Sequence, residues 1–160
     1  MKPLSHQSQS LDSQSGMMLL EALVAILIFS IGILAMVAMQ AVAIKQTGDA
    51  NYRTRATLLA NRLIGQMWVS SGDVSTLKAN FETGGSAYNA WLADVNSRDG
   101  LPGVVAASSG VVSTLPTVTV DDTVGATSGQ VTITLFWRTP EMLPDKPGHR
   151  HIVSSQIVRN

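Results

Sequence analysis

The sequence predicts an α+β fold, in which one long N-terminal α-helix packs on a small antiparallel β-sheet. Three observations predict this fold. No charged residue occurs between Glu21 and Lys45, and an amphipathic pattern then continues to Val69. Short runs rich in valine and threonine, separated by glycine and serine, fill the C-terminal part of the chain. Helical and strand patterns segregated along a chain in this way are typical of α+β domains.

The first half of the helix is long enough to cross a membrane. Between Glu21 and Lys45 lie 23 residues without a formal charge, which corresponds to about 35 Å of α-helix. Roughly 20 apolar residues suffice to span a bilayer. Gly32 lies inside this run, where a glycine permits close helix approach or a bend, and simple small-residue packing is the favoured interpretation.

The second half of the helix is predicted to be amphipathic. No proline occurs from Gln40 to Val69, and Ser70-Ser71-Gly72 is the expected end because glycine suits a helix C-cap. Apolar residues recur at steps of three or four, which favours packing on a sheet over a partner-binding helix. This apolar stripe comprises Tyr52, Ala56, Leu59, Leu63 and Met67, flanked by Ala60, Ile64 and Trp68. The opposite side carries Arg53, Arg55, Asn61, Arg62 and Gln66.

Beyond the long helix, the sequence predicts a short helix and several strands. Residues 74–85 are expected to form a polar connection, and residues 87–95 a helix that buries Tyr88, Trp91, Leu92 and Val95. The turn residues 99–103 end that helix. Alternating patterns then predict strands over residues 117–120, 131–137 and 151–158, with a possible edge strand over 103–112.

Composition excludes several classes of function. The chain has 160 residues, and its 11 lysines and arginines balance its 11 aspartates and glutamates. This neutrality gives no support for nucleic-acid binding. Because the chain has no cysteine, it can form neither a disulfide nor a thiolate metal site. No serine lies in a G-x-S-x-G motif, so no enzyme activity and no cofactor are predicted.

Two pairs of residues carry metal-binding side chains, but neither pair predicts a metal site. His149 and His151 would share one face of a strand, yet a site needs further ligands, which favours a solvated strand start. Asp121 and Asp122 precede Gly125, but calcium takes six or more oxygen ligands, which favours a turn.

The position of Glu21 is the most informative feature of the chain. This carboxylate follows Gly16 by five residues and stands at the mouth of the apolar run, where an ionised side chain is costly and normally paired. Before Gly16 the sequence is polar, with Lys2 and Asp12 its only charges. An ordinary secretory signal has an apolar region there, so it fits poorly. A plain signal anchor would leave Glu21 unexplained.

Gly16, Met17 and Glu21, followed by an apolar helix, resemble the processing site of type IV pilins and pseudopilins. The resemblance implies that a prepilin peptidase cuts between Gly16 and Met17 and that Met17 becomes N-methylated. The family more often has phenylalanine where this chain has Met17. The resemblance also implies that Glu21 is a register carboxylate, which pairs with the new amine of its own or a neighbouring subunit. Such a pair would govern the register and recruitment of subunits more than their stability, because the cost of desolvating the two charges offsets much of their attraction.

The same resemblance divides the chain into three parts. Residues 1–16 would be the leader peptide, residues 17–44 the transmembrane and fibre-core half of the helix, and residues 45–160 a periplasmic pilin-like globular domain. The protein would cross the inner membrane of a Gram-negative bacterium once and later enter the tip or base complex of a pilus fibre. Its implied partners are other minor and major pilins, prepilin peptidase, the pilus assembly machinery and, before assembly, the lipid bilayer.

Four local features occur further along the chain. They are Ile31-Gly32-Ile33-Leu34 before Met39-Gln40, Arg55-Ala56 before Leu59-Ala60-Asn61-Arg62-Leu63, Trp91 before Leu101-Pro102-Gly103, and Trp137 before the terminal strand. These features resemble PilV-type minor pilins in particular. The chain also lacks the cysteines and the membrane proline that are common in major pilins. The resemblance implies the function of a minor type IV pilin, a structural subunit needed for pilus assembly.

Two alternatives stay open at this stage. A minor pseudopilin of a type II secretion system would have much the same N-terminus, and its loss would abolish protein export instead of pili. An anchored periplasmic binding module or enzyme with a chance match between Gly16 and Glu21 would keep an uncleaved N-terminus.

Overall fold

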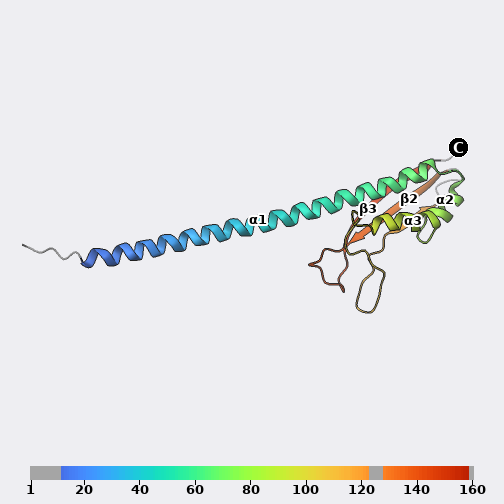
Figure 1. The fold of residues 1–160 in the computed structure, drawn as a ribbon. Helices are drawn as coiled ribbons and strands as arrows, with labels where there is room; N and C mark the ends of the chain where they lie inside the picture. The colour runs from blue at the N-terminus through green and yellow to red at the C-terminus, as the bar shows by residue number, and fades with distance from the viewer. Residues whose placement is uncertain (1–11, 123–127, 159–160) are drawn as a thin grey trace, which may run out of the picture. The chain divides into compact units, whose positions relative to one another are not determined.

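The computed structural model describes residues 12–122 and 128–158. It confirms the predicted α+β fold, with a small antiparallel sheet packed on the end of a long helix (Figure 1). The chain forms two compact units, Met1–Thr47 and Gly48–Asn160. Its elements are α1 (Asp12–Val69), α2 (Val74–Phe81), α3 (Ser86–Val95), β1 (Thr117–Asp121), β2 (Ser128–Trp137) and β3 (His149–Val158).

The described part of the first unit is helical throughout. Every side chain described from Gly16 to Thr47 is exposed, including Ile26 at 63% and Phe29 at 70%. The helix is long enough and apolar enough to cross a membrane. Large apolar side chains that find no protein core must be covered by lipid or by another protein, because exposing them to water is unfavourable.

In the second unit, the last turns of α1 supply one wall of the core. Ala56, Ala60, Leu63 and Met67 are fully buried, which confirms that the apolar stripe packs inward. Trp68, which was predicted to flank this stripe, is 49% exposed.

The sheet forms the opposite wall of the core. Its strand order is β1-β2-β3, and both pairings are antiparallel. Burial alternates along β2, where Val131, Ile133, Leu135 and Trp137 point inward and are at most 1% exposed. This period of two is the pattern from which the strands were predicted, and all three strands are confirmed with slightly longer bounds.

The expected polar connection over residues 74–85 is wrong, because α2 occupies most of it. Asp73 caps this helix: its carboxylate accepts hydrogen bonds from the Thr76 backbone N–H at 2.8 Å and from the Thr76 hydroxyl at 2.7 Å. Val74, Leu77 and Phe81 are buried at helical spacing. The sequence does contain a signal for this helix, an aspartate at the N-cap position followed by apolar residues three and four positions apart. The segment is short and otherwise polar, so this signal did not stand out.

We expect the cap on α2 to make stability depend on pH. Hydrogen bonds from the side chain and backbone of Thr76, and from Ser75, lower the pKa of Asp73 from 3.8 to about 2. A lowered pKa in the folded state stabilises the fold above the unfolded pKa, and this contribution disappears as the pH falls through about 2. The advantage of the natural chain over Asp73→Ala should therefore be full above about pH 4 and vanish near pH 2.

Denaturant midpoints of the two chains, measured between pH 7 and pH 2, check this expectation. Asp73→Asn is the control, because asparagine caps a helix without titrating and should lose no advantage over Asp73→Ala as the pH falls. A gap between the natural chain and Asp73→Ala that stays constant down to pH 2 would contradict the assigned role of the cap.

Helix α3 follows the prediction closely. Helix α3 buries Tyr88, Trp91 and Val95, while Leu92 is only half-buried. Its end is tightly packed, because a Cβ atom at Gly100 would collide with the backbone carbonyl oxygen of Val95. The chain reverses at this glycine, where no larger residue fits without a shift of the backbone.

The expected edge strand over residues 103–112 is wrong. This segment forms only an isolated bridge between Ser108 and Val111, and it contains glycines with positive φ at Gly103 and Gly110. Positive φ is incompatible with a regular strand. The long loop before β1 is instead held by Thr114, whose hydroxyl donates to the Gly103 carbonyl at 2.6 Å.

Arg138 fastens two loops at the end of the sheet. Its side chain is buried, and Nη2 donates to the backbone carbonyls of Val112 and Lys146, each at 3.0 Å. Its backbone N–H donates to the Pro102 carbonyl at 2.9 Å. One side chain therefore joins the loop after α3 to the loop between β2 and β3.

Candidate functional site

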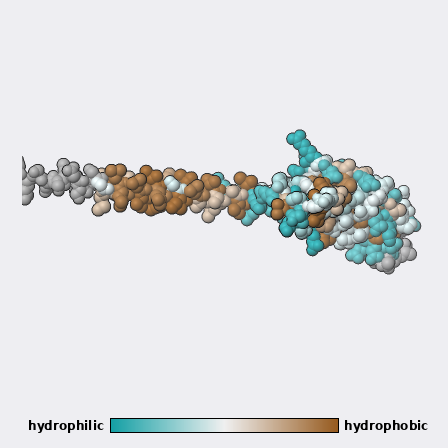
Figure 2. Space-filling model, turned by 90° about the horizontal axis from the view of Figure 1, so that it is seen from below, coloured by the Kyte–Doolittle hydropathy of each residue, from teal (hydrophilic) through white to brown (hydrophobic). Residues whose placement is uncertain are grey.

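The residues of the predicted processing site lie in successive turns of α1. Gly16, Met17 and Glu21 are all exposed, with 71% of the Met17 side chain accessible. Figure 2 shows that apolar residues cover most of the visible surface of this helical segment. Between Gly16 and Lys45, Glu21 is the only formally charged residue. The site therefore consists of a single carboxylate at the beginning of a continuous apolar surface.

Helical geometry places Met17 and Glu21 on the same face. They are four residues apart, which is about one turn. Helical side chains also tilt toward the N-terminus, so the Glu21 carboxylate leans back toward Met17. A free amine created at Met17 would lie within reach of this carboxylate. The unpaired N–H groups at a new helix start would add to the attraction for negative charge.

The peptide bond between Gly16 and Met17 lies inside the helix, because α1 begins at Asp12. Glycine in a helix interior is less favourable than alanine by roughly 0.5–1 kcal/mol. Local unwinding, which a protease needs in order to reach the carbonyl carbon, is therefore easier here than in the apolar turns that follow. Apart from the adjoining residues and backbone of the helix itself, nothing lies within 4 Å of a Cβ atom built on Gly16, so the backbone is open on this side.

The two histidines of β3 face the core instead of solvent. His151 Nε2 lies 3.1 Å from the Thr57 hydroxyl of α1. The same hydroxyl donates to the Arg53 carbonyl at 3.0 Å. The His149 ring stacks on Trp137 with ring centroids 5.6 Å apart. Both side chains are half-buried, so the expected solvated strand start is only partly correct.

Neither the two histidines nor the pair Asp121 and Asp122 is joined by further metal ligands. Within the described residues, no group of three histidine, cysteine or acidic side chains could hold a metal ion. Asp122 instead forms an ion pair with Lys78, with Nζ and Oδ1 3.2 Å apart. Gly125, which follows Asp121 and Asp122 in the calcium-loop interpretation, lies outside the described residues.

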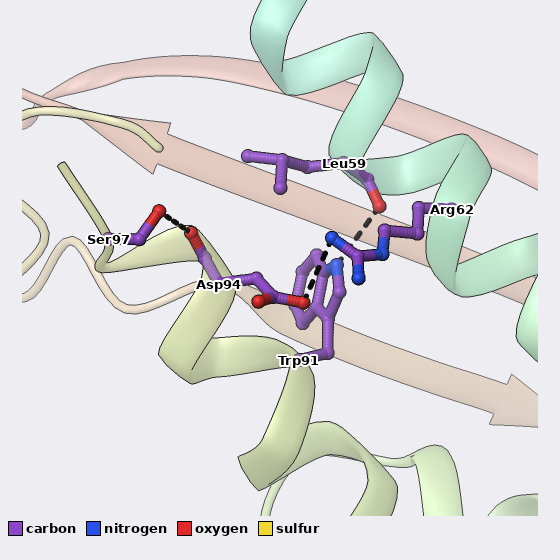
Figure 3. Close-up of polar contacts among 5 residues, drawn as sticks. All are labelled: Leu59, Arg62, Trp91, Asp94 and Ser97. Atoms are coloured by element: carbon purple, nitrogen blue, oxygen red, sulfur yellow. Dashed lines mark hydrogen bonds and ion pairs between the residues drawn. The ribbon is translucent and has the colours of Figure 1, made fainter. Parts of the chain in front are cut away.

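A polar contact between α1 and α3 was missed in the sequence. Figure 3 shows the Trp91 indole N–H donating to the backbone carbonyl of Leu59 at 3.0 Å. Beside it, Arg62 Nη1 lies 3.2 Å from Asp94 Oδ2, and the Ser97 hydroxyl donates to the Asp94 carbonyl at 2.7 Å (Figure 3). Arg62 was predicted to lie on the side of the long helix away from the apolar stripe. The sequence did not reveal that α3 contacts that side.

Arg55 makes a second connection on this side of α1. Its Nη1 donates to the Asp99 carbonyl at 3.1 Å, and its Nε donates to Asn51 at 2.8 Å. A shallow groove lies here, lined by Arg55, Leu58, Leu59, Arg62 and Asp99. Its two arginines are engaged in fixing α3 and the following loop, so the groove has a structural explanation.

The described structure thus offers one site with unusual chemistry, the carboxylate of Glu21 one turn from Met17 at the start of an exposed apolar helix. In the second unit, His151, Arg55 and Arg62 have partners within the fold. Comparison of the chain with protein-family models, with curated proteins and with solved structures finds no match.

Proposed function

We propose that this chain is a minor type IV pilin, a structural subunit that is processed after Gly16 and then joins a pilus through its N-terminal helix. The observation that carries the proposal is the position of Glu21, one helical turn from Met17 and at the start of an apolar, membrane-length helix. A simple anchor has no use for a carboxylate at this position, where burial in lipid is unfavourable.

In the proposed mechanism, prepilin peptidase cuts between Gly16 and Met17 on the cytoplasmic side of the inner membrane. The new amine of Met17 is methylated and remains a cation, and Glu21 provides the opposite charge. The assembly machinery then draws the helix out of the bilayer. Its exposed apolar side chains exchange lipid contacts for contacts with the helices of other minor and major pilins.

The second unit would lie in the periplasm and become the outer part of the subunit in the fibre. Its core is closed by α1, α2, α3 and the sheet without any disulfide, since the chain has no cysteine. A removed leader would take away Lys2 and Asp12, one charge of each sign, so the mature chain would remain neutral.

A minor pseudopilin of a type II secretion system is the second candidate, because the same residues at the start of α1 support it equally. The two candidates differ in the consequence of deleting the gene. Loss of pili with normal protein export supports the pilin, whereas loss of export with normal pili supports the pseudopilin. An anchored periplasmic module is the remaining possibility, and it requires an uncleaved N-terminus.

The proposed processing predicts a defined N-terminal mass. In cells with prepilin peptidase, the native protein should begin at methylated Met17, and without the peptidase it should retain residues 1–16. Gly16→Ala should block or slow the cut without disturbing the fold, because a Cβ atom there meets nothing within 4 Å beyond the adjoining residues and backbone of the helix itself.

Gly32→Ala is the matched control, since Gly32 is equally open and lies in the same helix. This variant should be processed normally. An intact Met1 in peptidase-positive cells, or a cut elsewhere, would contradict the proposal and favour the anchored module.

A further inference from the structure

The two edge strands of the sheet, β1 and β3, differ in length and in the partners of their outward-facing backbone groups. The edge formed by β1 spans five residues and is partly covered by Thr83. The Val118 N–H donates to the Thr83 hydroxyl at 2.8 Å, and the Thr83 N–H donates to the Val118 carbonyl at 3.1 Å. The edge formed by β3 spans ten residues, and within the described chain its only strand neighbour is β2.

The bonding of Val118 shows which backbone groups face the open edge of β3. Since both backbone groups of Val118 point to Thr83, those of its register partner Ile133 must point toward β3. Val153, opposite Ile133, therefore bonds to β2. Backbone direction alternates along a strand. Between residues 150 and 156, those that turn their N–H and C=O groups to the open edge are thus Arg150, Ile152, Ser154 and Gln156.

The same four residues direct their side chains to the outer face of the sheet, where all are exposed. Natural sheets usually blunt a long edge with proline, bulges, several charges or a covering segment. Strand β3 contains no proline, pairs with β2 in unbroken register over all ten residues, and carries Arg150 as its only permanent charge. Apart from the charge of Arg150, β3 therefore has no proline and no bulge that would block the pairing of a further strand.

We propose that the open edge of β3 binds an extended segment of a partner protein, which adds a fourth strand with a carboxylate opposite Arg150 and an apolar side chain beside Ile152. Strand β3 carries Arg150 on its outer face and no acidic residue, so charge complementarity favours a strand with a carboxylate at that position. Ile152 is 49% exposed and would be covered in the pairing. Main-chain hydrogen bonds give affinity in this mode, and alternate side chains give specificity.

Helix α1 offers apolar cover for the other face of the added strand. Thr57 contacts His151 of β3, so this side of α1 lies over β3. Ile64 and Trp68 follow Thr57 by seven and eleven residues and share its face of the helix. Trp68 is half exposed there, which leaves indole surface for a bound segment to cover.

A second copy of this chain fits the edge less well. In-register parallel pairing of two β3 strands would set Arg150 beside Arg150, and like charges at such positions are destabilising. Antiparallel pairing centred on Ser154 would set each Arg150 opposite Val158 and offer it no carboxylate. The inference concerns the second unit alone and does not rest on processing at Gly16.

The test uses the full chain in detergent micelles and a synthetic peptide of alternating valine and threonine, matched to the ten residues of β3 and carrying one glutamate. At about ten times the dissociation constant of the peptide, the amides of Ile152 and Ser154 should exchange hydrogen about tenfold more slowly. The same peptide with lysine in place of glutamate should bind at least about tenfold more weakly, which is about 1.4 kcal/mol.

Ser154→Pro removes an edge N–H without removing a bond to β2, because proline is tolerated where the N–H faces outward. This variant should fold and should lose peptide binding, whereas Ser154→Ala should keep it. Absence of peptide binding, or binding unchanged in Ser154→Pro, overturns the proposal. Slowed exchange that depends on protein concentration without peptide overturns it in favour of a second copy.

Discussion

Trp91→Ala should lower the free energy of unfolding by about 3–5 kcal/mol, the range for removing a buried large aromatic side chain. Only 1% of Trp91 is exposed, and the centroid of its ring lies 6.0 Å from that of the Tyr88 ring. The variant also loses the indole hydrogen bond to the Leu59 carbonyl, which fixes α3 against α1 (Figure 3). Since small domains are stable by only about 5–15 kcal/mol, the loss threatens the whole second unit.

Urea unfolding of the full chain in detergent, followed by circular dichroism, measures this effect. Trp68→Ala is the matched control, because Trp68 is 49% exposed and lies outside the core. It should change stability by less than about 1 kcal/mol. Equal losses in the two variants would show that Trp91 does not have the assigned part in joining α3 to α1.

Glu21→Gln should leave cleavage after Gly16 intact but reduce entry of the mature protein into fibres by at least about tenfold, or about 1.4 kcal/mol. Glutamine has nearly the same shape as glutamate but no charge. The amine of Met17 would then enter an apolar setting without a counter-charge, which is strongly unfavourable. The effect follows from the spacing of one helical turn between Met17 and Glu21.

The fraction of mature protein in sheared fibres, relative to the membrane, measures this effect. Glu21→Asp is the control, because it keeps the charge on a side chain one methylene shorter and should restore part of the incorporation. Normal incorporation of Glu21→Gln would contradict the role of Glu21 as a register carboxylate, although it would leave processing after Gly16 possible.

Long periodic patterns in the sequence predicted the main elements. The stripe that includes Ala56, Leu63 and Met67 repeats over several turns, and the alternation through β2 covers most of that strand. Helix α2 has only eight residues, too few for its period to stand out from a polar background. Segment 103–112 was misjudged because its valines suggested a strand, whereas the positive φ of Gly103 and Gly110 bends the chain.

The candidate site could be recognised in the sequence because its residues are close together along one helix. Gly16, Met17 and Glu21 need no tertiary contact to share a face. The bond from Trp91 to Leu59 spans 32 residues and depends on how two helices cross, which no local pattern specifies. The open edge of β3 likewise depends on the strand order, which the sequence left undetermined.

Arg138 allows the surface loops to change while the fold is kept. Its guanidinium and backbone N–H bind carbonyl oxygens of Val112, Lys146 and Pro102, and every amino acid supplies such an oxygen. Substitutions at the acceptor positions therefore retain the attachment, provided that the backbone path is preserved. Relatives of this chain should accordingly retain an arginine here while the exposed positions of both loops diverge, so that new surface chemistry can evolve on an unaltered framework.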